Sequence, residues 1–545
     1  MANVKFSRKD FEAVIKLTSE IQEKISLFGT PLETINDQEI ELEILANRPD
    51  LLSLHGFLRA FKGFLGKETG LKEYKVNKSG YKLIVEKSLP KEWPYAIACI
   101  VKGINFTDSK IKEVIDIQEK LGATILRKRK KGGIGLYPLQ KINFPVTFKG
   151  MKPEEIKFRP LEYPEVINGR QILSKHPTGR EYADLVTNWD KFPVFVDDKG
   201  AIMSMPPIIN SHDMGKIDEK TTDVFIEATG TDLRILKAVL NILVTALSDM
   251  GGKIYSISCI QQDKKVEELP NLTPEKMKVS LKNTNKLLGL ELTERQLKTC
   301  LEKMGHNYKN NEVEIPAWRT DILHEHDLIE DVVIAYGYEN LTPTIPNISS
   351  VGQENPLEIK KRRLSEILVG LNMLETSSFH LTTLTDQVKN VSGDKENLIE
   401  ISDSKTEYNL LRKDLLSCLL KTLSENSDSE YPQRIFELGR VFDKDKKSDT
   451  AIIEKEHLSI TIADQKTNFT EIKQAFDYLM KMLEKEYEIK TASNHFFVEG
   501  RCGAIIVDNK EIGFIGEISP NILSTLKIKM PIAALELDIE EVLNK

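Results

Sequence analysis

The chain has 545 residues, of which 40% are hydrophobic and 29% are charged, and its formal net charge is −7. This length exceeds what one hydrophobic core supports and predicts roughly three to five domains. No apolar run approaches the roughly 18 residues of a membrane span, and the negative charge argues against a protein that coats nucleic acid through bulk electrostatics.

The first residues, MANVKFSRKDFEAVIKL, show no apolar core followed by a small-residue cleavage site. They predict the first helix of a domain and not an export signal, and with it a cytoplasmic protein. The cysteines form no CxxC pair, which predicts reduced thiols and neither a zinc site nor a disulfide framework. They stand far apart, at Cys99, Cys259, Cys300, Cys418 and Cys502.

A strand followed by a helix is predicted next. Residues 39–45, EIELEIL, alternate Glu with Ile and Leu, the period of a strand with one buried face. The turn ANRPD follows, and Pro49 and Asp50 stand where helix starts prefer them. The apolar spacing in LLSLHGFLRAFKGFLG predicts a helix that ends at the following glycines. We assign residues 1–88 to an N-terminal α+β domain.

Residues 89–262 mix short apolar strands with turns marked by Pro and Gly. They end in DLRILKAVLNILVTALSDMGG, whose apolar residues form a helical stripe that stops at the paired glycines. This pattern predicts an α+β domain that closes with a buried helix.

Two further domains follow. Residues 268–345 predict a small helical domain, and NLTPTIPNISSVGQENPLE, with three prolines and no periodicity, predicts a linker. Residues 355–545 combine amphipathic helices with alternating strands such as GAIIVDNKEIGFIGEI. The predicted fold class is a multidomain α+β protein.

One stretch in the small helical domain, AWRTDILHEHDLIEDVVIAYGYENL, crowds acidic residues together. Asp327, Glu330 and Asp331 have the i, i+3, i+4 spacing of one helix face, and Asp321 precedes them in an approach turn. The apolar residues occupy the opposite face, so the acids should be displayed to solvent. Either the dipole at the helix N-terminus or a hard cation could offset their repulsion. Spacing alone leaves both alternatives open.

Other motifs are weaker. The run RKRKK, residues 127–131, could bind phosphates or form a solvated loop. The GxG of Gly133 and Gly135 lacks the rest of a dinucleotide fingerprint, and His324 and His326 do not match the zinc motif HExxH. Neither a Walker loop nor a nucleophile elbow is present.

Four ordered segments carry a family resemblance: ANRPDLLSLHGFLRAFKGFLG, PVFVDDKGAIMSMPPIINSHD, IPAWRTDILHEHDLIEDVVIAYGYENLTP and RIFELGRVF. Each resembles the β subunits of phenylalanine–tRNA ligases in their shorter, archaeal and eukaryotic form. The resemblance spans nearly the whole chain. It implies an α2β2 ligase that joins phenylalanine to tRNA(Phe) with ATP, on adenylation sites of the α subunit. The shorter form leaves the tRNA contacts to other surfaces: RKRKK could supply part of them, and the net charge of −7 suggests that the α subunit carries more.

The resemblance also implies residue roles. It makes Asp321, Asp327, Glu330 and Asp331 ligands of Mg²⁺, some of them through water. It makes residues 89–262 an editing domain that hydrolyses tRNA charged with tyrosine, with Asn210, Ser211, Glu227 and Asp232 as pocket residues. The residues themselves also suit simpler roles, since Asn210 and Ser211 follow a turn and Asp232 stands at a helix N-cap.

Residues 355–545 resemble a class II synthetase fold, in which RIFELGRVF occupies a substrate-binding strand. The late glycine-rich strand, IGFIGEISPN, lacks the arginine that a working site uses to hold ATP. We therefore expect a catalytically silent domain. Two alternatives to a ligase subunit are a free-standing hydrolase of mischarged tRNA and a metal-dependent phosphohydrolase centred on the acidic stretch. The second has little support, because no phosphate-binding loop accompanies it.

Overall fold

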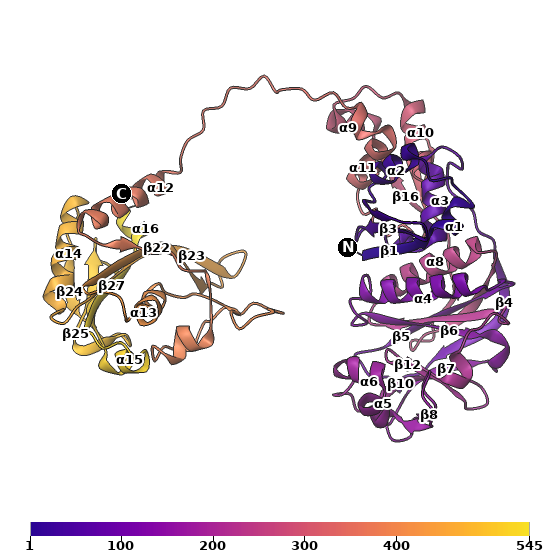
Figure 1. The fold of residues 1–545 in the computed structure, drawn as a ribbon, viewed down its shortest axis with the longest axis horizontal. Coiled ribbons are helices and arrows are strands. Elements are labelled where there is room, and N and C mark those ends of the chain that lie inside the picture. Colours follow the sequence, from indigo (N-terminus) through magenta and orange to yellow (C-terminus); the bar gives the residue numbers. More distant parts are fainter. Residues whose placement is uncertain (1, 544–545) are drawn as a thin grey trace. The chain divides into compact units, whose positions relative to one another are not determined.

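A computed structural model describes residues 2–543 of the chain. They form two compact units, residues 1–345 and 346–545. Residues 341–355 contain neither helix nor strand and connect the units (Figure 1), which confirms the predicted linker. Within the described range, no helix is both long enough and apolar enough to cross a membrane.

The first unit begins with a three-stranded antiparallel sheet in the order β1 (Ala2–Ser7), β3 (Glu39–Ile44), β2 (Leu32–Ile35). The predicted strand at 39–45 is confirmed. The helix predicted from the first residues is confirmed only from Arg8 to Glu12. Residues 2–7 form a strand instead, because Val4 and Phe6 alternate into the core as β1 pairs with β3. Helices α1 (Arg8–Glu12), α2 (Ser19–Leu27) and α3 (Leu54–Phe64) follow, and Pro49–Leu51 form a 3₁₀ turn before α3.

A large mixed sheet forms the middle of this unit. Its order is β12-β11-β10-β7-β4-β14-β5-β13-β6, and β15 pairs with β14. The strands are β4 (Val76–Val85), β5 (Tyr95–Lys102), β6 (Gly132–Pro138), β7 (Val146–Met151), β10 (Phe192–Val196), β11 (Ile202–Met205), β12 (Ile209–Asn210), β13 (Val224–Gly230), β14 (Lys253–Ile260) and β15 (Val266–Leu269).

Two helices cover one side of the large sheet, α4 (Asp108–Ala123) and α8 (Leu233–Asp249) (Figure 1). Helix α8 is the predicted buried helix, and it packs between the sheet and α3. Short elements complete this part of the chain: β8 (Lys157–Phe158), β9 (Ile167–Asn168), α5 (Gly169–Lys175), α6 (Pro177–Glu181) and α7 (His212–Gly215).

The predicted division at residue 88 cuts through this sheet. β4 lies before that boundary, yet it pairs in parallel with β14 and β7. Partners so distant in sequence cannot be read from the alternation of a single strand. The N-terminal and editing-like regions therefore do not separate at this point.

The small domain before the linker contains more than helices. Helices α9 (Leu281–Leu288), α10 (Glu294–Lys303) and α11 (Glu325–Tyr336) accompany a three-stranded sheet. Its order is β16 (Glu275–Lys278), β18 (Glu312–Ile315), β17 (Asn307–Lys309). The purely helical prediction is corrected, because these strands are too short for sequence periodicity to reveal them.

The second unit is built on a seven-stranded sheet in the order β19-β22-β23-β27-β26-β25-β24, antiparallel except for the pair β19–β22. RIFELGRVF lies in β22, as predicted. The strands are β19 (Leu374–Glu375), β22 (Gln433–Lys444), β23 (Ile452–Ala463), β24 (Glu488–Thr491), β25 (Phe497–Val507), β26 (Lys510–Ile518) and β27 (Ile532–Asp538); β20 (Leu381–Thr382) and β21 (Leu410–Leu411) form a separate pair.

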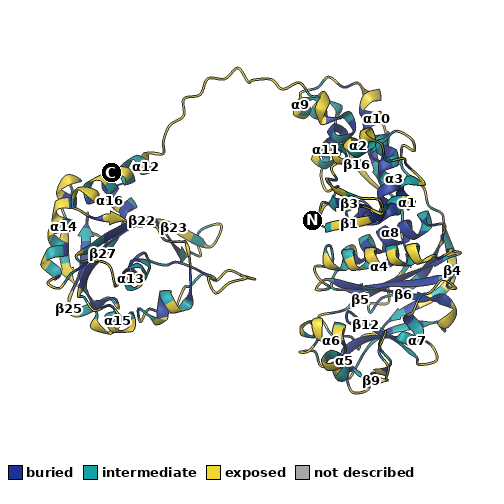
Figure 2. Cartoon of the chain, in the orientation of Figure 1, coloured by how far each residue is buried: buried dark blue, intermediate teal, exposed yellow. Residues whose placement is uncertain are grey.

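Both faces of the seven-stranded sheet are covered, and Figure 2 shows its inner strands largely buried, whereas the edge strands β19 and β24 are mostly exposed. Alternate residues of β27 belong to different cores: Ala533, Leu535 and Leu537 to one, Ile532 and Ala534 to the other. The first core includes residues of α12 (Pro356–Gly370), α14 (Phe469–Met482) and α16 (Ile539–Leu543), and the second includes residues of α13 (Leu416–Glu425) and α15 (Pro520–Thr525).

Candidate functional site

Strand β13, next to the edge strand β6 of the large sheet, carries a buried carboxyl group, Glu227, whose residue is 2% exposed. β13 lies between β5 and β6, and Glu227 is opposite Gly135 of β6. Because side chains alternate along a strand, Thr229 lies on the same face as Glu227. The Glu227 carboxyl group is therefore shielded from bulk water.

Tyr137 links Glu227 to a second predicted residue. Its hydroxyl lies 3.2 Å from Glu227 Oε1 and 3.2 Å from Asn210 Oδ1. Asn210 is in the short strand β12, opposite Ser204 of β11. The structure therefore brings Asn210 and Glu227 together around one phenol.

Burial determines the protonation of this group. It raises the pKa of Glu227 to about 8, and burial together with the nearby Glu227 raises the pKa of Tyr137 well above its usual value. At pH 7 Glu227 is therefore mostly a neutral carboxylic acid, which can donate one hydrogen bond and accept others. Among residues 2–543, three buried oxygens of this region have no hydrogen-bond partner: Glu227 Oε2, Ser204 Oγ and Thr229 Oγ1.

Glycines on β6 allow the acid and the phenol to pack closely against that strand. A Cβ on Gly135 would collide with the Glu227 carboxyl and the Tyr137 hydroxyl, and one on Gly133 would lie 3.3 Å from Pro207. Gly133, Gly135 and Tyr137 alternate on one face of β6. The sequence analysis missed Tyr137 and Ser204. The period-2 pattern GxGxY was the available signal for Tyr137.

The other two predicted pocket residues have visible structural roles. Ser211 is buried, directly follows Asn210 and precedes α7 without capping it through its side chain. Asp232 is the N-cap of α8, where its side chain accepts a hydrogen bond of 2.8 Å from the Arg234 amide. Ser211 is thus beside the cluster, while Asp232 has the capping role that its position also suggested.

The acidic stretch does not form the displayed face that its spacing predicts. Asp331 is buried, and its carboxylate accepts hydrogen bonds from Arg319 Nη2 at 2.9 Å and His306 Nε2 at 2.7 Å. Burial opposes its ionisation, but Arg319 and His306 overcome that effect and lower the pKa of Asp331 to about 2. A buried arginine thus neutralises a residue expected to face solvent.

Arg319 also forms an ion pair with Asp321. Its Nε and Nη2 donate to the two carboxylate oxygens at 2.8 and 2.7 Å. Asp327 caps the start of α11, because its Oδ2 accepts from the Leu323 and His324 amides at 2.7 and 2.8 Å. His324 is the N-cap itself, which gives it a structural role in place of metal binding.

Glu330 is the exposed member of the four acids. Partial burial and the charges of Asp331, Asp327 and Asp321 raise its pKa. Within residues 2–543, no group of three or more His, Cys, Asp and Glu side chains is arranged to hold a metal ion. The four acids fit Mg²⁺ only in part: Asp321 and Asp331 are committed to Arg319, while Asp327 and Glu330 remain accessible for contacts through water.

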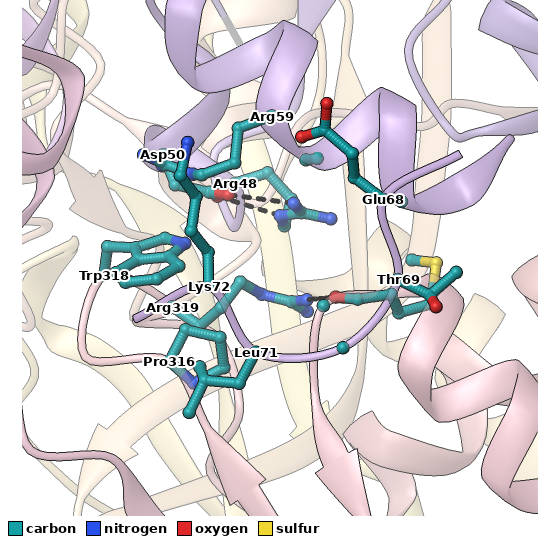
Figure 3. Close-up of a pocket in the computed structure, with 15 residues that line it drawn as sticks. Arg48, Asp50, Arg59, Glu68, Thr69, Leu71, Lys72, Pro316, Trp318 and Arg319 are labelled. Carbon is teal, nitrogen blue, oxygen red and sulfur yellow. Dashed lines mark hydrogen bonds and ion pairs between the residues drawn. The ribbon is translucent and has the colours of Figure 1, made fainter. Parts of the chain in front are cut away.

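Arg319 also lines a cavity of about 220 Å³ between α3 and the small domain (Figure 3). Each guanidinium group around this cavity has a carboxylate partner: Arg48 with Asp50, Arg59 with Asp249, and Arg319 with Asp321. The Arg59 guanidinium also lies 4.6 Å from the centre of the Trp318 ring. We interpret this region as a charge-compensated joint within the first unit.

Comparisons with known proteins cover both units. Residues 277–338 match the tRNA synthetase B5 domain, and residues 341–539 match the phenylalanyl-tRNA synthetase beta chain CLM domain. The chain is 37% identical over 496 residues to the phenylalanine–tRNA ligase beta subunit of Pyrococcus horikoshii, a match that covers 90% of this chain and 89% of that protein. It is 36% identical over 527 residues to the corresponding subunit of Archaeoglobus fulgidus, covering 95% and 94%.

A solved structure resembles the first unit. It is the crystal structure of an N-terminal fragment of the phenylalanyl-tRNA synthetase beta subunit from Pyrococcus horikoshii. The match has a TM-score of 0.59 at 36% identity, and it covers 62% of this chain and 99% of the fragment.

Proposed function

This chain belongs to the family of phenylalanine–tRNA ligase β subunits, and on that premise we propose that its Glu227 pocket removes tyrosine from mischarged tRNA. The chain serves as the β subunit in the synthesis of phenylalanyl-tRNA, an aminoacyl-tRNA ligase reaction. Its partners are accordingly an α subunit and tRNA. The editing activity and its residues are the proposal.

One observation carries the editing proposal: Glu227 is buried and mostly neutral, and its Oε1 lies 3.2 Å from the Tyr137 hydroxyl. A phenolic substrate hydroxyl both donates and accepts hydrogen bonds, and a neutral carboxylic acid matches both roles. Glu227 Oε2, which has no partner within residues 2–543, is the acceptor or donor available to it. Asn210 and Ser211 flank the same space.

The same geometry would discriminate against phenylalanine. A phenylalanine ring would leave Glu227 Oε2 without a partner, and sites built to bind a hydroxyl discriminate against the analogue that lacks it by roughly 10⁴- to 10⁵-fold. Hydrolysis then breaks the ester between tyrosine and the terminal ribose and releases uncharged tRNA. Phenylalanyl-tRNA lacks the hydroxyl that would bond to Glu227, so its ester should not be held in the pocket.

Substitutions of Glu227 test this role in the ligase complex. Glu227→Ala should lower kcat/KM for deacylation of tyrosyl-tRNA by about 10- to 100-fold, the effect of losing one buried hydrogen-bonded partner. Glu227→Gln keeps a neutral donor and acceptor and should retain most activity. Loss of all deacylation in Glu227→Gln would instead make Glu227 an ionised base and contradict the assignment.

Gly135→Ala provides an independent test, because its added methyl group would clash with the Glu227 carboxyl and the Tyr137 hydroxyl and displace them. It should abolish deacylation of tyrosyl-tRNA while phenylalanylation by the complex continues at the wild-type rate. The phenylalanylation rate also reports whether each variant is folded and assembled.

Adenylation of phenylalanine is proposed for the α subunit, within an α2β2 assembly that uses ATP. Support comes from the second unit, where helices and packed side chains cover both faces of the sheet. The purified chain alone should make no phenylalanyl-tRNA, and co-expression with its α partner should restore the activity. A co-purified complex should have twice the summed mass of two different chains.

A free-standing editing hydrolase is the alternative to the assembly. It requires that the isolated 61.9 kDa chain deacylates tyrosyl-tRNA and remains a monomer when it is purified from its native source. A co-purifying α subunit would exclude it.

Mg²⁺ binding is proposed at the exposed side of the acidic stretch. Asp327 and Glu330 would hold a hydrated ion, with Asp321 beside them, and Asp331 would stabilise the fold through Arg319. The ion would supply positive charge among crowded carboxylates and so relieve their repulsion, which adds to partial burial in raising the pKa of Glu330. Calorimetric titration should show Mg²⁺ binding that Glu330→Gln weakens; an unchanged affinity in that variant would remove Glu330 from the site.

A further inference from the structure

The basic run Arg127–Lys131, here called the basic loop, has an unusual backbone. Its first three residues, Arg127, Lys128 and Arg129, have φ angles of +49°, +52° and +62°. Glycine adopts this region without steric cost, whereas residues with a Cβ rarely do. The chain nevertheless places three long cationic side chains at these positions, between α4 and β6.

Hydrogen bonds hold the loop in this conformation. The Lys128 and Arg129 amides donate to the Ala123 and Gly122 carbonyls at 3.3 and 3.1 Å, and the Lys131 amide donates to Leu126 at 3.0 Å. The backbone donors are therefore already used. Any recognition by this loop must come from its side chains.

Arg129 fixes the loop to the segment that leads into Asn210. Its Nη1 donates to the carbonyls of Pro207 and Ile208 at 3.1 and 2.9 Å, and its guanidinium lies 4.3 Å from the centre of the Tyr182 ring. Pro207 and Asn210 are three residues apart, so their Cα atoms lie within about 11 Å of each other. The loop is thus held beside the pocket by its own arginine.

The remaining cations of the loop are free to bind a ligand. Arg127, Lys128 and Lys130 are exposed, and within residues 2–543 their side chains make neither a hydrogen bond nor an ion pair. Other arginines of this unit, such as Arg59 and Arg319, are paired with carboxylates. In a chain of net charge −7, the basic loop is a local site of uncompensated positive charge.

We propose that Arg127, Lys128 and Lys130 bind backbone phosphates next to the 3′ end of the tRNA whose aminoacyl group enters the Glu227 pocket. This proposal rests on the proposed editing function. An aminoacyl ester in the pocket is attached to the terminal ribose of the tRNA. The phosphate that links this ribose to the preceding nucleotide must therefore lie close to the pocket. Exposed Arg and Lys side chains bind such phosphates without regard to base sequence.

The test compares Arg127→Ala/Lys128→Ala with the wild type in the complex of full-length chains. Alanine also carries a Cβ, so the charge is removed while the backbone preference is kept. Affinity for tRNA is measured as a function of salt, together with KM and kcat for deacylation of tyrosyl-tRNA. Removing two phosphate contacts should reduce the slope of log K against log salt by about 1.4 for a single strand, and raise KM more than it lowers kcat.

Lys282→Ala/Lys286→Ala is the matched control. Both lysines are exposed on α9, and neither has a partner within residues 2–543. This variant loses the same charge and should leave the salt slope and deacylation unchanged. Lys128→Gly is a second probe of the loop, because it relieves the positive φ and should weaken tRNA binding without lowering the melting temperature.

An unchanged salt slope in Arg127→Ala/Lys128→Ala, or the same change in the control variant, would overturn the proposal. Failure of editing would look different, since the wild-type complex would not deacylate tyrosyl-tRNA at all. A reduced slope in that case would still place tRNA phosphates on the basic loop. The two proposals therefore fail on separate measurements.

Discussion

Glu227 is a titrating group whose proposed editing role requires its neutral form. Its pKa is about 8 in the fold, against an ordinary value of 4.5. The folded state therefore binds its proton more tightly than the unfolded state does. The stability that this proton contributes is fully present below pH 4.5 and is lost as the pH rises through 8.

The resulting prediction concerns stability and pH. From pH 5 to pH 8.5 the wild type should lose more stability than Glu227→Gln, because glutamine cannot ionise. Urea denaturation at several pH values measures this difference. Parallel curves for the two proteins would contradict a raised pKa for Glu227.

Arg319 contributes to stability, since it neutralises two buried carboxylates, Asp321 and Asp331. Its side chain is 1% exposed, and Asp321 and Asp331 are 9% and 5% exposed. Removing one partner of a buried ion pair typically costs about 3–5 kcal/mol, because a charge is left without compensation.

Arg319→Met should therefore destabilise the first unit by about 3–5 kcal/mol. Chemical denaturation gives the value. Glu330→Gln, on the same acidic stretch but exposed, is the control and should change stability by less than about 0.5 kcal/mol.

At the scale of elements, α8 determines how Asp232 should be interpreted. The helix has buried residues along most of its length, and Asp232 caps its first turn. Loss of an N-cap carboxylate typically costs about 1 kcal/mol, and asparagine caps as well as aspartate.

Asp232→Ala should thus destabilise the protein by about 1 kcal/mol, and Asp232→Asn should restore the wild-type value. Both are expected to deacylate tyrosyl-tRNA normally, which melting curves and kinetics together would check. Loss of deacylation in Asp232→Asn would instead indicate that Asp232 is a pocket residue.

At the scale of the whole molecule, residues 341–355 join two units that have separate cores. All of these residues except Leu341 are exposed, and none lies in a helix or strand. Protease sites concentrate in such segments, because cleavage there requires no unfolding of packed structure.

Brief digestion of the isolated chain with the glutamate-specific protease should cut first at Glu354. Mass spectrometry should find fragments close to the two units in size. Early cleavage within either unit would show that the linker is not the most accessible segment.

The sequence by itself determined the elements whose signal is local. The alternation in residues 39–45, the apolar stripe of α8 and the prolines of the linker each lie within one window, so the physics that shapes them is visible there. Four ordered motifs also identified the family. The start of the chain was misread, because partners for Val4 and Phe6 lie on β3.

Tertiary structure decided the sites. Helical spacing placed Asp331 with Glu330, but the arginine that pairs with Asp331 comes from a separate turn, and His306 comes from the segment between α10 and β17. Hydrogen bonds bring together Tyr137, Asn210 and Glu227 from three strands. Such groups are brought together by strand pairing and burial, which depend on residues distant in sequence. One window therefore cannot show which charges are neutralised and which remain free.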